Sequence, residues 1–171
     1  MMHNIQLVLQ PIVVYSIIIH IIFSCLIGDL LCCRANDHQG QRKAGLYGDY
    51  NCDVPLVSVE SMLSFIADMD PSIDYVLWSG DNPPHDMWEE SQSTQLNASH
   101  DVTELIMRYF PNTPVYPVLG NHEGFPANLY NQSTDSWLTD GLASLWRRWL
   151  DDDAFNTVCS HDMNMNVIIL L

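Results

Sequence analysis

Basic residues are scarce in this sequence: 6 lysines and arginines stand against 21 aspartates and glutamates, for a formal net charge of -15 at pH 7. Proteins that bind nucleic acid or anionic membrane surfaces use clustered lysine and arginine to neutralise phosphates, and the sequence has no such cluster. The composition therefore argues against a nucleic-acid partner and against simple electrostatic attachment to an acidic membrane. An excess of carboxylates does suit solubility at neutral pH.

Charged residues are absent from residues 5–28, which read IQLVLQPIVVYSIIIHIIFSCLIG. A helix of this length would cross a hydrocarbon core of about 30 Å, although Pro11 and His20 interrupt the run. The initiator side lacks the lysine or arginine of a signal peptide, and the site before Cys25 matches a cleavage site poorly. We expect a hydrophobic leader over residues 1–28, either a secretory signal peptide or an uncleaved anchor that contacts the membrane. A buried strand ranks below both because the run is too long for one.

The cysteines include no Cys-x-x-Cys pair, so a zinc knuckle is not expected. Adjacent Cys32 and Cys33 cannot easily bond with each other, which leaves Cys25 and Cys52 as nearby partners. Sequons begin at Asn97 and Asn131 and predict glycosylation. Together with the apolar leader, these features predict a product of the secretory pathway, extracellular or lysosomal, or membrane-anchored where the leader is retained.

Hydrophobic periodicity alternates between helix and strand along the chain. Apolar residues recur every three or four positions over 56–66, 102–109 and 138–149, and short apolar runs cover 73–78 and 115–119. We interpret the last helix as broken by the acidic triplet at 151–153. The order helix, strand, helix, strand, helix predicts an α/β layered domain of βαβ units with right-handed crossovers. Both strands would then end at one edge of the sheet, where ligands of open α/β sheets bind.

A polar cluster follows each predicted strand: GDNPPHD at residues 80–86 and GNHE at residues 120–123. The topology predicts that Asp81 and Asn121 face each other. A carboxylate and an amide oxygen are hard ligands for a cation, and a histidine such as His122 can donate a proton to a phosphoryl oxygen or leaving group. Either cluster alone is most often a turn, but their joint occurrence at two strand ends favours a functional site.

These clusters resemble the signature of the calcineurin-like metallophosphoesterases. LWSGDNPPHDMW at residues 77–88 and PVYPVLGNHEGFP at residues 114–126 are similar to the acid sphingomyelinase branch in particular. The resemblance extends through LLCCR, YGDYNCDVPLVSVESML and SLWRRWL and covers residues 29–158. It implies part of a sandwich of sheets flanked by helices. It also implies hydrolysis of the phosphodiester of sphingomyelin to ceramide and phosphocholine by the complete family form.

The resemblance further implies a pair of zinc ions that activate a water nucleophile and neutralise the phosphate. In this comparison Asp81 resembles the carboxylate that bridges both metals, and Asn121 resembles the amide ligand of the second. His122 and His85 resemble the proton donors on the phosphate side. Disulfides are implied between Cys33 and Cys52 and between Cys25 and Cys32.

The sequence departs from the family's ligand set. No Asp-x-His motif precedes Asp81, and His161 matches neither the lone histidine nor the Gly-His-x-His motif expected downstream. We expect these residues to contain no saposin-like domain. Asp81 and Asn121 alone would hold zinc weakly, because catalytic zinc sites use at least three protein ligands. We therefore expect an incomplete metallophosphoesterase domain over 29–158, with the leader and a divergent tail over 159–171 resembling foreign sequence joined to it. A non-catalytic secreted or tethered fragment that binds or competes is the alternative function.

Overall fold

The computed structural model describes residues 16–17, 44–50, 53–85, 88–130 and 135–159. Within them the strands are β1 (Ser16–Ile17), β2 (Val76–Trp78) and β3 (Val115–Pro117). The helices are α1 (Leu56–Met69), α2 (Gln92–Tyr109), α3 (Ser136–Trp146) and α4 (Asp152–Cys159).

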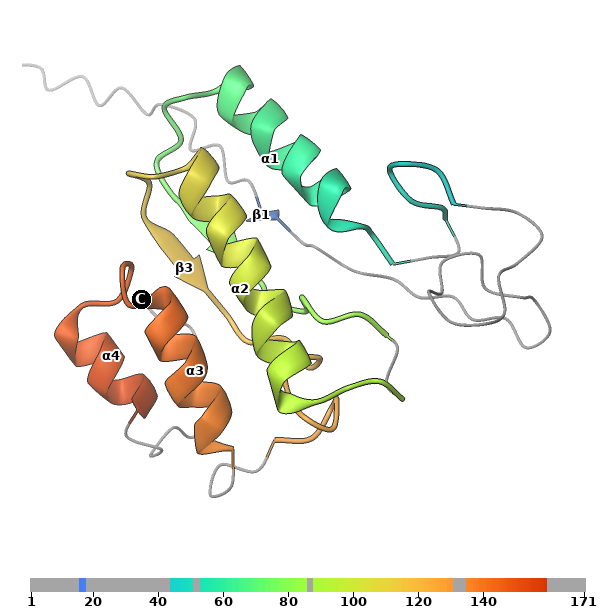
Figure 1. Ribbon diagram of the computed structural model, residues 1–171. Helices are drawn as coiled ribbons and strands as arrows, with labels where there is room; N and C mark the ends of the chain where they lie inside the picture. The colour runs from blue at the N-terminus through green and yellow to red at the C-terminus, as the bar shows by residue number, and fades with distance from the viewer. Residues whose placement is uncertain (1–15, 18–43, 51–52, 86–87, 131–134, 160–171) are drawn as a thin grey trace, which may run out of the picture.

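The strands form one parallel sheet in the order β1-β2-β3. In the chain α1 lies between β1 and β2, and α2 lies between β2 and β3, which is the arrangement of consecutive βαβ units. The helices form a row in which α2 contacts α1 and α3, and α3 contacts α4 (Figure 1). The predicted α/β class is confirmed.

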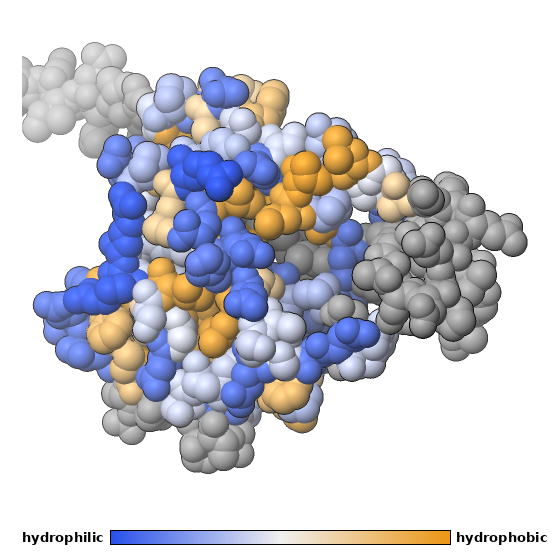
Figure 2. Space-filling view, in the orientation of Figure 1, coloured by the Kyte–Doolittle hydropathy of each residue, from blue (hydrophilic) through white to orange (hydrophobic). Residues whose placement is uncertain are grey.

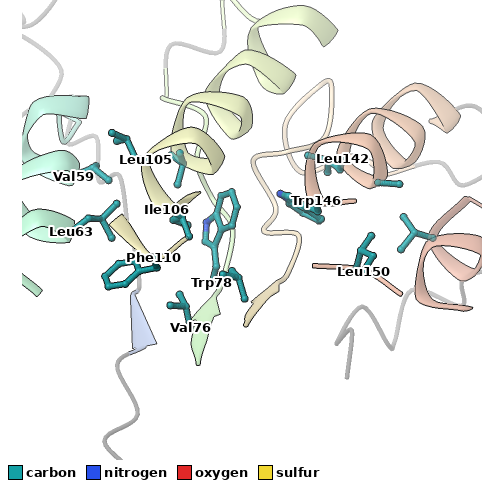
Figure 3. Packing of buried hydrophobic residues seen from close by; sticks show 14 of the residues in the cluster. Val59, Leu63, Val76, Trp78, Leu105, Ile106, Phe110, Leu142, Trp146 and Leu150 are labelled. Carbon is teal, nitrogen blue, oxygen red and sulfur yellow. The ribbon is translucent and has the colours of Figure 1, made fainter. Parts of the chain in front are cut away.

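Trp78, the last residue of β2, lies at the centre of the core beneath α2 (Figure 3). Its side chain is 1% exposed, and its ring packs edge-on against Trp146 of α3 with 5.6 Å between ring centroids. Leu63 of α1 and Ile106 of α2 complete the packing from the neighbouring helices. An aromatic pair of this geometry contributes about 0.5–1.5 kcal/mol beyond its buried area. The strand that leads into the first polar cluster is therefore fixed by three helices.

The second face of the sheet is only partly covered in the described part of the chain. Leu77 and Tyr116 alternate with the buried residues of β2 and β3 and are 39% and 36% exposed. The outer side of α1 is also apolar, with Phe65 and Met69 exposed, and Figure 2 shows hydrophobic residues on the surface over this helix. The described helices thus bury one face of the sheet and leave apolar side chains on two surfaces.

The start of α2 differs from the sequence prediction. The periodic apolar residues begin at Val102, but the helix begins at Gln92. Ser91 and Thr94 form a capping box, in which the Thr94 nitrogen donates to Ser91 Oγ at 3.1 Å and the Ser91 nitrogen donates to Thr94 Oγ1 at 2.8 Å. The polar first half of this helix was not assigned because its buried residues bond to loops instead of filling the apolar core.

The last predicted helix is α3, and it is followed by a further helix, α4, that the periodicity did not predict. α3 ends at Trp146, before the acidic triplet, and Asp152 and Asp153 form the first turn of α4 instead of breaking a helix. Asp151 Oδ1 accepts a hydrogen bond from the Ala154 nitrogen at 2.8 Å. Carboxylates are favourable at this end of a helix, where free N–H groups carry partial positive charge. The strands are also shorter than predicted, 76–78 and 115–117.

Ser16 and Ile17, within the apolar run, form β1 and pair with Leu77 and Trp78. A strand is the alternative that the sequence analysis ranked below a leader; the rest of residues 1–28 lies outside the described residues. No helix in the described ranges is long and apolar enough to span a membrane. Other predictions also fall outside these ranges: those for Cys25, Cys32, Cys33, Cys52, Asn131 and residues 160–171. Asn97 is exposed on α2, and its glycosylation stays a prediction.

Candidate functional site

The polar clusters become two loops that meet at the carboxyl edge of the sheet. We call them the strand-end loops: residues 80–85 after β2 and residues 120–124 after β3. Gly80 has a φ of 76° and Asp81 a φ of 61°, both in the left-handed region. A Cβ built on Gly80 would lie 2.3 Å from the Gly120 nitrogen, so the loops pass backbone against backbone. This close passage brings the Asp81 carboxylate to the second loop.

Asp81 and Asn121 face each other, as the topology predicts. Asp81 Oδ1 accepts from the His122 nitrogen at 3.0 Å, and the Asn121 side-chain oxygen lies 3.3 Å from both carboxylate oxygens of Asp81. Asn121 Nδ2 donates to Asn128 Oδ1 at 2.8 Å. With the amides of Asn121 and Asn128 both turned over, Asn121 would donate to Asp81 and accept from Asn128. Asp81 and Asn121 therefore place a carboxylate beside an amide, two groups whose oxygens can bind a divalent cation.

Glu123 connects the two strand-end loops from their buried side. Its side chain is fully buried, and Oε2 accepts from the nitrogens of Gly120 at 2.7 Å and Asp81 at 3.1 Å. Oε1 accepts from the Asn82 nitrogen and from Asn82 Nδ2, both at 2.8 Å. Burial raises the pKa of Glu123 above its usual range, while hydrogen bonds from backbone amides oppose the shift. One carboxylate thus fixes the backbone that carries the candidate metal ligands.

Asn82 and Gln95 connect the strand-end loops to the core. Trp78 Nε1 donates to Asn82 Oδ1 at 3.0 Å, and Asn82 Nδ2 lies 3.4 Å from Ser99 Oγ. Gln95 Nε2 donates to the backbone oxygen of His122 at 2.9 Å. Asn82, Gln95 and Ser99 are all buried, so these hydrogen bonds satisfy groups that would otherwise be costly to bury. The first half of α2 therefore supports both loops.

The two candidate histidines lie against each other. The ring centroids of His85 and His122 are 4.3 Å apart with 58° between the ring planes. His85 Nδ1 lies 3.1 Å from Asp53 Oδ1. His122 Nδ1 is buried and has no hydrogen-bond partner among the described residues. The structure thus brings together the residues that the sequence singled out: Asp81, Asn121, His85 and His122.

The supporting residues were not identified from the sequence. Glu123 and Asn82 lie within the polar clusters but have no role in the sequence prediction, and Gln95 and Ser99 lie in the polar segment before the predicted helix. A signal was present, because positions 95 and 99 continue the four-residue spacing that leads to Thr103, which is also buried. Polar residues on a buried helical stripe indicate that a polar structure covers that part of the helix.

The candidate metal ligands in this site are oxygen atoms. Within the described ranges, no group of three or more histidine, cysteine, aspartate or glutamate side chains could hold a metal ion. Asp81 supplies a carboxylate that is partly buried, and Asn121 supplies an exposed amide. The donor chemistry fits a hard divalent cation, and additional ligands would be needed for tight binding.

Tyr130 covers the second loop. Its hydroxyl donates to the backbone oxygen of Gly120. Burial raises the pKa of the Tyr130 phenol well above its usual range, and the negative charges of Glu123 and Asp81 raise it further. The phenol is therefore held protonated beside two carboxylates.

The free energy of unfolding is expected to fall above about pH 10 because of Tyr130. An ordinary tyrosine in the unfolded chain ionises near pH 10, whereas the folded phenol keeps its proton, so the stabilisation is present below that pH and is lost as the pH rises. Urea unfolding between pH 8 and 11 measures this effect. Tyr130→Phe should flatten the alkaline decline, and an equally steep decline in that variant would contradict the assignment.

Known proteins are similar in sequence to most of this chain. Residues 26–168 match the family model of the calcineurin-like phosphoesterases. The chain is 43% identical over 131 residues to sphingomyelin phosphodiesterase A of Dictyostelium discoideum, covering 77% of this chain and 22% of that protein. It is 36% identical over 140 residues to the Homo sapiens sphingomyelin phosphodiesterase, covering 76% and 22%. It is 36% identical over 115 residues to the cyclic GMP-AMP phosphodiesterase SMPDL3A of Bos taurus, covering 67% and 25%. The chain therefore spans about a quarter or less of the length of these relatives.

Proposed function

Because the chain belongs to the calcineurin-like phosphoesterase family, and within it to the acid sphingomyelinase family, we propose that its strand-end loops form part of a metal-dependent phosphodiesterase centre. The observation that carries the proposal is that the Asp81 carboxylate and the Asn121 side-chain amide lie together at the carboxyl edge of the sheet, with 3.3 Å between the amide and both carboxylate oxygens. Carboxylate and amide oxygens are ligands that divalent cations take in proteins. The His85 and His122 rings, which contact each other at a tilt of 58°, lie in the same loops.

Asp81 and Asn121 would hold the cation, and we propose zinc from the family resemblance. When bound, metal ions would activate a water nucleophile and neutralise charge on the phosphate. The chain's own groups do the remaining work. His85 and His122 present imidazoles that can give a proton to the leaving oxygen or hydrogen-bond a phosphoryl oxygen. Glu123 keeps the backbone of both loops fixed, so the ligands need little rearrangement on binding.

A phosphodiester lipid of the sphingomyelin type is the proposed substrate, since sphingomyelin phosphodiesterases are among the relatives. The sequence resemblance favours this class over the nucleotide-cleaving branch through Glu123 and the His85-Asp86-x-Trp88 run. The alternative is a non-catalytic binding role. The observation that favours it is that the described residues offer Asp81 and Asn121 but no cluster of three or more acidic, histidine or cysteine ligands.

Metal titration of the purified chain tests the proposal. We expect weak binding of Zn²⁺ that Asp81→Asn reduces about tenfold or more, because the variant loses the only charged ligand of the proposed pair. Asp101→Asn, at an exposed position of α2, is the matched control and should change nothing. Binding that is indifferent to Asp81 would overturn the metal assignment.

Hydrolysis of sphingomyelin in detergent micelles, and of an aryl phosphodiester, is measured at about pH 5 on the same preparations. With so few protein ligands, we expect no turnover by this chain alone. Two tightly bound zinc ions per chain, with turnover that Asp81→Ala abolishes, would refute the expectation of an incomplete centre. Those results would show that the chain is catalytically active by itself.

A further inference from the structure

Asp53 makes a two-point contact with His85 across a long sequence separation. Asp53 Oδ2 accepts from the His85 backbone nitrogen at 2.9 Å, and Oδ1 lies 3.1 Å from His85 Nδ1. The side chains are 13% and 31% exposed, so the contact is shielded from water on the aspartate side. Each carboxylate oxygen thus has a separate task, one on the backbone and one on the ring.

The chemistry of the pair sets the proton position on the ring. An ionised carboxylate can only accept hydrogen bonds, so the ring nitrogen that contacts it must carry the hydrogen. In the neutral ring Nδ1 is then the donor to Asp53, and Nε2 is left with its lone pair. We propose that Asp53 is a positioning residue that fixes the tautomer and orientation of His85, so that Nε2 is the nitrogen that takes up a proton from solvent and passes it to the leaving oxygen. The inference rests on the proposed function, in which His85 acts on the phosphodiester.

Two further features hold the ring in this orientation. Pro83 and Pro84 precede His85 and restrict the backbone of the loop, and Pro83 is fully buried. The ring of His122 lies 4.3 Å from that of His85, on a segment held by Gln95 and Asp81. The imidazole is therefore constrained through its backbone, its neighbouring ring and its Nδ1 atom.

A purely structural role for Asp53 would require only one of its two contacts with His85. The bond from Oδ2 to the His85 nitrogen already ties the segment before α1 to the first strand-end loop. The second oxygen adds nothing to that connection but determines which ring nitrogen is protonated. His100 and Asp101, which are adjacent in sequence, form a contrasting pair. Their Nδ1 and Oδ1 atoms lie 3.5 Å apart, and both side chains are more than half exposed.

Nitrogen-15 NMR of the histidine rings tests the proposal on the metal-free chain at about pH 8, where an ordinary histidine is neutral. The ring signals of His85 are assigned with a His85→Gln variant. We expect His85 to be predominantly protonated at Nδ1. Asp53→Asn should lower the ratio of the Nδ1-H to the Nε2-H form about tenfold, because the amide offers a weaker acceptor and can itself donate. Asp101→Asn is the control and should leave the His85 signals unchanged.

Two results would overturn the proposal: a wild-type His85 that carries its proton on Nε2, or a His85 ratio that Asp53→Asn does not alter. The first needs no variant, so the test survives if Asp53→Asn does not fold. Failure of the metal titration described above would remove the phosphodiesterase function and leave the tautomer measurement standing. The two ideas therefore fail separately.

Discussion

Replacing Glu123 by glutamine is expected to lower the free energy of unfolding by about 2–4 kcal/mol, since at least one buried donor loses its partner and each such loss costs about 1–3 kcal/mol. The carboxylate accepts from the nitrogens of Asp81, Asn82 and Gly120 and from Asn82 Nδ2. The glutamine amide nitrogen cannot accept, and it would meet N–H groups at close range. Urea unfolding followed by circular dichroism measures the change.

Glu104→Gln is the matched control, because Glu104 is an exposed residue of α2 and the same charge is removed there. We expect that change to stay within about 0.5 kcal/mol of the unsubstituted chain. A Glu123→Gln protein as stable as the control would show that the buried carboxylate does not hold the strand-end loops together. Weakened Zn²⁺ binding in a variant that still folds would in turn show that Glu123 orders the candidate metal ligands Asp81 and Asn121.

Gly80→Ala is expected to cost about 2–5 kcal/mol, or to prevent folding. The added methyl group would lie 2.3 Å from the Gly120 nitrogen and 2.5 Å from the Val118 oxygen, both backbone atoms of the second loop. The φ of 76° adds strain of about 1–2 kcal/mol for a residue with a side chain, and overpacking adds about 1–3 kcal/mol. Thermal unfolding and the yield of soluble protein report the effect.

Gly45→Ala tests whether any glycine would give the same result. A Cβ at Gly45 meets its nearest heavy atom at 3.5 Å, an ordinary van der Waals contact. We expect a change of less than about 1 kcal/mol there. Equal losses of stability at the two positions would show that the close passage of the strand-end loops does not exclude a side chain at position 80.

The fold class and the position of the functional edge could be predicted because periodicity is a property of single segments. The stripe of Val59 and Leu63 defines α1, and the apolar run that ends at Trp78 defines β2. The limits of α2 and α3 could not be predicted in the same way. The start of α2 is set by the Ser91 cap and by polar residues that pack against loops, and the apolar stripe continues past the end of α3 into the following turn.

The four residues named for chemistry were found through short motifs, because the carboxyl ends of neighbouring parallel strands must lie together. The residues that hold these four in place could not be predicted from short motifs. Glu123 and Asn82 are buried polar residues, and a single sequence does not show which polar side chains point inward. Asp53 is likewise distant from His85 in the chain, and only the fold places their side chains together.

The hydrogen bond from Trp78 to Asn82 joins a buried ring of the core to the loop that carries Asp81. Loosening that loop would disturb an indole that α2 and α3 hold on either side. A cation or phosphate that arrives at Asp81 and Asn121 therefore meets a backbone whose conformational entropy has already been lost on folding. Little of the binding free energy is then spent on ordering the protein, and the geometry of whatever binds there must adapt to the site.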